Sequence, residues 1–180
     1  MAIRTKNNRD VQLKILTGSD HLKLSAYLNL LSDETRGRFG PHAYDIESIQ
    51  AFYLKAAHIG FIAVEEETAS IVAYAIIKAG YLEHDAQRLT SYGLWLDHVT
   101  DCSFAPSVAD DWQCEGLGHL ILDFVLDYIC FAGYQRVFLW GGVQANNERA
   151  LNYYKKWGFK TLGVFEYNGM NYDMVMTLKI

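Results

Sequence analysis

The sequence predicts a single α/β domain, with α+β character, built on a mixed and mostly antiparallel sheet flanked by helices. Three observations lead to this prediction. The chain has 180 residues, enough for one domain with a substantial core. A strand, an apolar helix and another strand follow one another over residues 100–140, an order that makes the two strands parallel. Two other stretches, 61–77 and 159–178, each hold two strand-like segments around a short turn, which indicates antiparallel hairpins.

The individual elements follow from apolar periodicity and from turn-forming residues. Alternating or short apolar runs predict strands at 11–16, 61–65, 71–77, 100–108, 136–140, 159–167 and 170–178. Capping residues and helical apolar spacing predict helices at 19–31, 45–57, 116–131 and 147–157. The Asn168-Gly169 pair is typical of a two-residue hairpin turn. Residues 1–10 are polar and are expected to form a loose terminus, and 81–98 carry no clear pattern.

Composition narrows the class of protein. The chain is 51% hydrophobic and 21% charged, which is typical of a globular protein. A formal net charge of -5 argues against a nucleic-acid binder that uses a basic surface. The start of the chain lacks the apolar core of a signal peptide, and the most apolar segment, 117–131, contains two aspartates and is too short to cross a bilayer. We therefore expect a cytoplasmic protein without nucleic-acid or membrane partners, as a monomer or homodimer.

The three cysteines are scattered through the chain at Cys102, Cys114 and Cys130. An odd number without regular spacing indicates reduced thiols rather than a disulfide framework. Cys102 and Cys130 are expected to be buried and inert. The histidines show no ligand spacing with cysteine or carboxylate, so no metal site is expected.

The helix at 116–131 carries one polar row, His119, Asp123 and Asp127, at four-residue spacing. Residues four apart lie on one face of a helix. The row is therefore expected to be the solvent-facing stripe of an otherwise apolar helix.

A glycine-rich turn leads into this helix. Gln113, Gly116 and Gly118 form a Q-x-x-G-x-G pattern between the strand and the helix. Glycines let a ligand approach the backbone closely, and the first turn of a helix offers unpaired N–H groups and a positive dipole end. The turn is therefore predicted to bind an anion, such as a pyrophosphate.

Two other phosphate-binding loops fit this turn poorly. The dinucleotide fingerprint G-x-G-x-x-G follows the first strand of a βαβ unit, whereas this turn lies two thirds along the chain with a different spacing. The P-loop requires a Gly-Lys pair, which the chain lacks. A plain connecting turn without a ligand stays open as an alternative.

The turn, preceded by Val108, resembles the acyl-CoA loop of the GNAT superfamily of N-acyltransferases. A second motif strengthens the resemblance: the stretch from Asn147 through Ala150 and Tyr154 to Gly158-Phe159 is similar to the family's N-x-x-A-x-x-x-Y-x-x-x-G-F helix. The resemblance implies one domain with six to seven strands and a splayed parallel pair at the centre of the sheet. Pro106, which cannot donate an N–H, fits the opening of that pair at an edge or a bulge.

The resemblance also implies the reaction and the residues. The co-substrate would be acetyl-CoA, with no metal, and an acetyl group would pass to a primary amine by direct attack. Tyr154 would protonate the leaving thiolate, and the backbone of Ser107 or Val108 would stabilise the oxyanion. The residues implied to contact the cofactor are Pro106, Ser107, Val108, Gln113, Cys114, Glu115, Gly116, Leu117, Gly118, His119, Asn147 and Tyr154.

Two positions depart from the family pattern. Many relatives place a glycine and a basic residue after the glutamine, where this chain has Cys114 and Glu115. An acid beside a pyrophosphate lowers affinity unless it points to water. Relatives often carry a glutamate base on the preceding strand, where this chain has Asp101 as the candidate base, unless the amine arrives neutral.

Other functions stay open from the sequence. The same machinery can use a longer acyl-CoA, and a non-catalytic acyl-CoA-binding module would need no Tyr154. A dinucleotide-dependent oxidoreductase fits least, because the fingerprint is missing. The acceptor amine is not readable, although Tyr81, Tyr92 and Trp95 are expected to shape its pocket.

Overall fold

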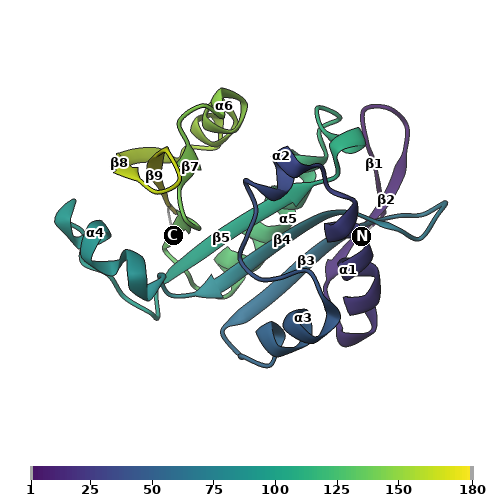
Figure 1. Ribbon diagram of the computed structural model, residues 1–180, viewed down its shortest axis with the longest axis horizontal. Helices are drawn as coiled ribbons and strands as arrows, with labels where there is room; N and C mark the ends of the chain where they lie inside the picture. The colour runs from purple at the N-terminus through teal and green to yellow at the C-terminus, as the bar shows by residue number, and fades with distance from the viewer. Residues whose placement is uncertain (1, 179–180) are drawn as a thin grey trace. The chain divides into compact units, whose positions relative to one another are not determined.

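The structure, a computed structural model, describes residues 2–178 (Figure 1). Its strands are β1 (Ala2–Arg4), β2 (Asp10–Ile15), β3 (His58–Glu65), β4 (Ile71–Ala79), β5 (Asp101–Val108), β6 (Arg136–Leu139), β7 (Val143–Gln144), β8 (Lys160–Glu166) and β9 (Met170–Thr177). Its helices are α1 (His21–Leu30), α2 (Asp33–Arg36), α3 (Ile46–Tyr53), α4 (Ala86–Ser91), α5 (Leu117–Phe131) and α6 (Glu148–Lys156).

The predicted mixed sheet is confirmed. The strands follow the order β1-β2-β3-β4-β5-β6-β9-β7, with β8 paired to β9. The parallel pair is β5 and β6, in a register that runs from Asp101 opposite Arg136 to Phe104 opposite Leu139. The described sheet has nine strands rather than six or seven. The two extra strands, β1 and β7, have three and two residues, too few to give a recognisable alternation.

The loose terminus predicted for residues 1–10 is wrong for its described part. Ala2–Arg4 pairs antiparallel with the start of β2, in register from Ala2 opposite Gln12 to Arg4 opposite Asp10. The Arg4 guanidinium donates to both oxygens of the Asp10 carboxylate at 2.7 and 2.8 Å. Polar residues can therefore form an edge strand here, because backbone pairing does not need an apolar side chain. Met1 and residues 179–180 lie outside the described part of the chain.

The chain divides into two compact units. The first holds described residues up to Ile77 together with Ala105–Tyr128, and the second holds Lys78–Phe104 with the chain from Ile129. In the first unit, α3 lies in front of the strands in Figure 1 and α5 lies behind them. On the α5 side, Phe61 of β3 packs edge-on against Phe124 and Tyr128. On the other side, the Tyr27 hydroxyl of α1 hydrogen-bonds to Ser107 of β5 at 3.0 Å.

The second unit contains the two elements that end the chain, the α6 helix and the β8–β9 hairpin. Asn168 and Gly169 both have positive φ, 49° and 105°, so the predicted two-residue turn is confirmed. Residues 81–98 form a 3₁₀ turn and α4. Tyr81 and Tyr92 pack against an apolar cluster of Leu89, Phe138 and Val175, whereas the Trp95 side chain is 85% exposed.

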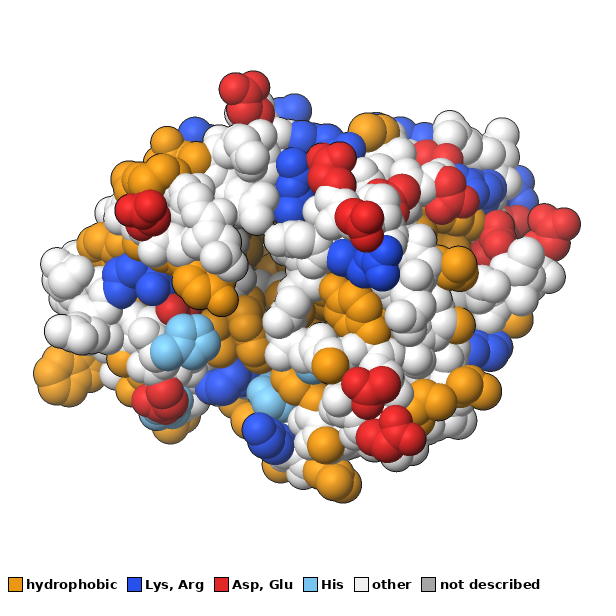
Figure 2. Space-filling view, in the orientation of Figure 1, with side chains coloured by type: hydrophobic (Ala, Val, Ile, Leu, Met, Phe, Trp, Pro, Cys, Tyr) orange, Lys and Arg blue, Asp and Glu red, His pale blue; other side chains and the backbone are white. Residues whose placement is uncertain are grey.

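Surface features complete the fold. His119, Asp123 and Asp127 are exposed on α5, so the predicted polar stripe is confirmed. On the face shown in Figure 2, acidic and basic side chains are interspersed. Over residues 2–178, none of the helices combines the length and the apolar character that a membrane crossing requires.

Candidate acyl-CoA site

The glycine-rich turn takes a backbone shape that few side chains accept. Asp110–Trp112 form a short 3₁₀ turn, and α5 begins at Leu117. Between them, Cys114 and Gly116 have positive φ angles of 68° and 87°. Glycine adopts this left-handed region without strain, which explains the glycine at 116. Cys114 holds it as a non-glycine residue, so the surrounding contacts must fix the turn.

Four consecutive backbone N–H groups in this turn, from Cys114 to Leu117, donate no hydrogen bond within the described residues. Helix α5 begins at the end of this row, where the N–H groups of His119 and Leu120 both donate to the Gly116 carbonyl. Such a row of N–H donors at the positive end of a 15-residue helix can bind the oxygens of a pyrophosphate.

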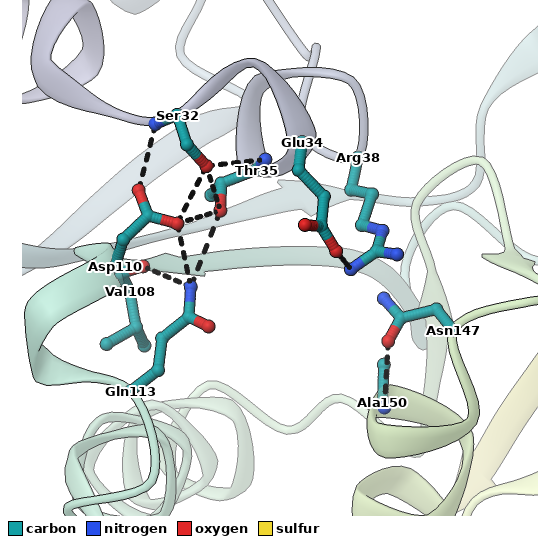
Figure 3. Close-up of polar contacts among 9 residues, drawn as sticks. All are labelled: Ser32, Glu34, Thr35, Arg38, Val108, Asp110, Gln113, Asn147 and Ala150. Carbon is teal, nitrogen blue, oxygen red and sulfur yellow. Dashed lines mark hydrogen bonds and ion pairs between the residues drawn. The ribbon is translucent and has the colours of Figure 1, made fainter.

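The turn is held from one side by α2. Asp110 accepts hydrogen bonds from the Ser32 backbone at 2.8 Å and from the Ser32 and Thr35 hydroxyls at 2.8 and 2.6 Å (Figure 3). Partial burial opposes ionisation of Asp110, but these hydrogen bonds outweigh it and lower its pKa. The Gln113 amide donates to the Val108 carbonyl at 3.2 Å, so the glutamine fastens the turn to the end of β5.

The β1–β2 turn holds the other side of the glycine-rich turn, a contact that no local sequence pattern indicates. The Arg9 guanidinium donates to both Glu115 oxygens and to the Asp111 carbonyl, and it lies 3.5 Å over the Trp112 ring. This hydrogen-bonded pairing lowers the pKa of Glu115 and balances its charge. The expected conflict between Glu115 and a phosphate is therefore relieved by an arginine and not by exposure to water.

Within β5, the direction of each backbone group follows from its neighbours. The Ala109 N–H donates to Val72 next to β4, so Ser107 also directs its N–H toward β4. Val108, between them, directs its N–H to the opposite side. Of the two oxyanion donors implied by the resemblance, Val108 is therefore the one that faces away from β4.

Pro106 lies on the same side of β5 as Val108, where its missing N–H breaks no bond to β4. The Gly80 N–H donates to the Asp101 backbone carbonyl, and the Ala109 N–H donates to the Val72 backbone carbonyl. Between these two bonds, β4 advances eight positions, from 72 to 80, and β5 also advances eight, from 101 to 109. Because these intervals are equal, β5 passes Pro106 with no net insertion relative to β4. On the β6 side, the described β5–β6 ladder ends at Phe104, before Pro106, so an edge or a bulge at Pro106 on that side stays a prediction.

Asp101, the candidate base, is fully buried in the second unit. Its carboxylate accepts from Arg136 Nε at 2.7 Å and Nη2 at 2.9 Å, and from the Asp97 N–H at 2.8 Å. A buried carboxylate whose oxygens already accept from three donors is not available to accept the proton of a substrate ammonium. This environment fits an ion pair that joins β5 to β6 and argues against a base.

Helix α6, also in the second unit, carries both residues of the second motif. Asn147 is the N-cap, and its side-chain oxygen accepts from the Ala150 N–H at 3.2 Å (Figure 3). This bond leaves its amide NH₂ without a partner in the described structure. Tyr154 is 8% exposed and packs against the rings of Tyr153 and Phe159. Burial raises the pKa of Tyr154, and its hydroxyl bonds to no described residue.

The cysteines are distributed differently from the expectation. Cys102 is buried in β5, as predicted, and burial raises its pKa. Cys130 is exposed, so its predicted burial is wrong. It follows the buried Ile129 near the end of α5 and lies on the outer face of the helix, which an apolar run of sequence letters does not reveal.

Comparison with known proteins identifies the family. The family model described as Acetyltransferase (GNAT) family matches residues 24–159. The chain therefore belongs to the GNAT acetyltransferase family. No curated protein sequence matches it.

Solved structures share the fold at low sequence identity. The GNAT domain of S. lividans PAT has a TM-score of 0.76 and 14% identity, covering 99% of this chain and 96% of that one. A GNAT-family acetyltransferase from Streptococcus pneumoniae has a TM-score of 0.70 and 20% identity, covering 93% and 99%. The putative acetyltransferase yncA from Salmonella typhimurium, solved with its cofactor acetyl-CoA, has a TM-score of 0.69 and 15% identity, covering 94% and 95%.

Proposed function

We propose that this protein transfers an acetyl group from acetyl-CoA to the primary amine of a small molecule or a protein. The observation that carries the proposal is the row of four N–H donors from Cys114 to Leu117 at the start of α5. Membership of the acetyltransferase family supports it, as does the fold shared with yncA, which was solved with acetyl-CoA. In this proposal the four N–H groups bind the pyrophosphate of the co-substrate.

The reaction begins when the amine lone pair attacks the thioester carbonyl. A C–N bond forms, negative charge gathers on the oxygen, and the C–S bond then breaks to release a thiolate. The Val108 N–H donates to the developing oxyanion, and the Asn147 amide binds the arm of the co-substrate. Tyr154 gives its proton to the thiolate, and the proton that the attacking nitrogen loses as the amide forms passes through water and restores the Tyr154 hydroxyl.

The proposal assigns no base to the chain, because Asp101 is committed to Arg136. The amine is taken to arrive neutral, having lost its proton to water. The rate at limiting amine should then rise with pH up to the pKa of the acceptor, which is about 10.4 for a lysine-like amine.

Ligand-dependent thermal unfolding tests the binding half of the proposal. CoA and acetyl-CoA at about 100 times Kd should stabilise the protein by about 2.7 kcal/mol, and NAD and ATP far less. Gly116→Ala strains a backbone with φ of 87° and should remove the CoA shift. Gly133→Ala is the matched control, since its φ is 83° and nothing lies near its added Cβ. Equal stabilisation by NAD, or a full CoA shift in Gly116→Ala, would contradict the proposed site.

A thiol-release screen tests the catalytic half. Acetyl-CoA is offered with amino sugars, polyamines, amino acids and peptides, and release of free CoA is measured. Release that depends on one class of amine supports the transferase. CoA binding without CoA release in the presence of any amine would favour a non-catalytic acyl-CoA-binding module. CoA release only from longer acyl-CoAs would mean that the acyl donor is not acetyl-CoA.

A further inference from the structure

The turn between β1 and β2, residues 5–9, is docked on the glycine-rich turn. It is closed internally by the Thr5 N–H to Arg9 carbonyl bond at 2.9 Å and the Asn8 N–H to Thr5 carbonyl bond at 3.1 Å. It is joined to the glycine-rich turn by the Lys6 N–H, which donates to the Glu115 carbonyl at 3.3 Å, and by the Arg9–Glu115 ion pair. These bonds therefore hold the β1–β2 turn in place beside the four N–H donors.

The Lys6 side chain extends from the β1–β2 turn over Gly116. A Cβ placed on Gly116 would lie 3.4 Å from Lys6 Cε and 3.6 Å from Lys6 Cδ and Cγ. The ammonium is one bond beyond Cε, so it lies close to the glycine whose N–H belongs to the donor row. The side chain is exposed, and no carboxylate in the described structure pairs with its ammonium.

The other charges near the turn are already engaged. Arg9 is bound to Glu115, and Asp110 accepts from Ser32 and Thr35. Asp111 is 77% exposed and lies 4.0 Å from Arg9. Lys6 is thus the nearby cation that no described carboxylate engages, and it stands where a doubly charged anion on the donor row would gain from it.

We propose that Lys6 is a ligand of the pyrophosphate of CoA, supplying from the β1–β2 turn the positive charge that the glycine-rich turn itself lacks. This inference rests on the proposed function, since it assumes that CoA binds at the turn. The pyrophosphate is chosen over the 3′-phosphate of CoA because Lys6 lies over Gly116, within the donor row. Its ammonium binds phosphate as a compact point charge, without the paired geometry of an arginine.

The test measures CoA affinity by calorimetry for three variants. Lys6→Met keeps an unbranched chain over Gly116 and removes the charge, and Lys6→Arg keeps the charge. Lys55→Met, at an exposed residue just after α3, removes the same charge elsewhere and is the matched control. Each protein is titrated with CoA and with dephospho-CoA, at 0.1 M and 1 M salt, and its unliganded melting temperature is measured as a check on folding.

We expect Lys6→Met to weaken CoA and dephospho-CoA equally, by about fivefold at 0.1 M salt, as an exposed ion pair allows. At 1 M salt the difference should nearly vanish, because screening then acts over about 3 Å. Lys6→Arg should bind within about twofold of the native protein, and Lys55→Met should be unchanged.

Two results would overturn the inference. If Lys6→Met binds CoA as tightly as Lys55→Met does, Lys6 is not a ligand. If Lys6→Met weakens the binding of CoA but not of dephospho-CoA, Lys6 contacts the 3′-phosphate and the pyrophosphate assignment is wrong. Failure of the native protein to bind CoA at all would instead contradict the proposed function, so the two failures are distinguishable.

Discussion

Arg9 and Glu115 lie 106 positions apart in the chain and meet as an ion pair in which one guanidinium contacts both carboxylate oxygens. The Glu115 side chain is 11% exposed and that of Arg9 is 29% exposed, so solvent screens the pair only in part. In the sequence, Glu115 predicts weaker phosphate binding unless its side chain points to water. In the structure, its charge is balanced by a residue that also supports Trp112.

This pair leads to a prediction about charge balance. Arg9→Met should weaken CoA binding by about fivefold, because it leaves the Glu115 carboxylate unbalanced beside the pyrophosphate. Glu115→Gln should bind CoA at least as tightly as the native protein. The double variant should return close to native affinity, since neither charge remains. Calorimetric titration of the four proteins gives the coupling between the two residues.

The outcome also separates charge from packing. Methionine can keep part of the apolar contact with Trp112 that the Arg9 guanidinium makes. If the double variant stays as weak as Arg9→Met, the arginine acts by holding Trp112, and the electrostatic explanation is wrong.

A second prediction uses the two exposed cysteines. Saturating CoA should slow alkylation of Cys114 by at least about tenfold, because a ligand on the N–H donors at 114–117 covers this residue. Cys130 is exposed at the far end of α5 and should react at the same rate with and without CoA. It therefore serves as an internal control when both sites are followed by peptide mass spectrometry. Equal protection of both thiols, or of neither, would contradict binding at the turn.

These residues show what sequence can and cannot predict. The glycines at 116 and 118 and the Asn147-to-Phe159 spacing are local patterns, so both motifs were found. Arg9 and Lys6 reach the turn only because β1 and β2 form a hairpin, and no local pattern links them to Glu115. The polar sequence around them predicts a loose terminus, so it does not indicate these two charged residues of the candidate site.

Asp101 illustrates a different limit. It was a reasonable candidate base because it lies on the strand before the turn. Its neutralisation depends on the β5–β6 register, which places it directly opposite Arg136. The parallel order of the two strands was predicted, but their register was not, because it depends on packing across the sheet.

A third prediction separates an ion pair from a base at this position. Asp101→Asn should lower the free energy of unfolding by about 3 kcal/mol, because it leaves the Arg136 guanidinium without its buried partner. Arg136→Met should cost a similar amount. Urea unfolding measures both losses. At temperatures where Asp101→Asn is folded, the pH profile of kcat/KM should keep its native shape, and loss of a rising limb at acidic pH would restore Asp101 as the base.

A fourth prediction concerns alkaline pH. Burial raises the pKa of Tyr27, Tyr53 and Tyr74 in the first unit. Above pH 10, the ordinary pKa of tyrosine, the unfolded chain holds fewer protons than the native protein. Stability should therefore be independent of these groups below pH 10 and should fall above it, by up to about 1.4 kcal/mol per pH unit for each tyrosine.

Urea unfolding between pH 8 and pH 11 measures this slope. Tyr27→Phe should reduce the fall in stability per pH unit above pH 10 by the contribution of one tyrosine. Tyr167→Phe, at a side chain that is 70% exposed, should leave it unchanged. A slope that Tyr27→Phe does not alter would mean that Tyr27 ionises as readily in the native protein as in the unfolded chain.

The last prediction concerns Tyr154. Tyr154→Phe removes a hydroxyl that bonds to no described residue and keeps the ring that packs on Phe159, so stability should barely change. Because burial raises the pKa of the phenol, proton transfer to a thiolate of pKa about 8.5 is uphill. We therefore expect the acid to contribute near the lower end of the usual range, about 100-fold in turnover. Steady-state turnover with an amine from the screen measures it.

Tyr153→Phe is the control, because it makes the same chemical change on the adjacent residue of α6 and should leave turnover within about twofold. Acetyl-CoA affinity should be nearly native in both variants, since the proposed acid acts after binding. Full turnover in Tyr154→Phe would refute the acid and leave the thiolate to be protonated by water. A loss of affinity with unchanged turnover would mean that the hydroxyl holds the co-substrate, because an interaction present equally before and during the reaction lowers KM and not kcat.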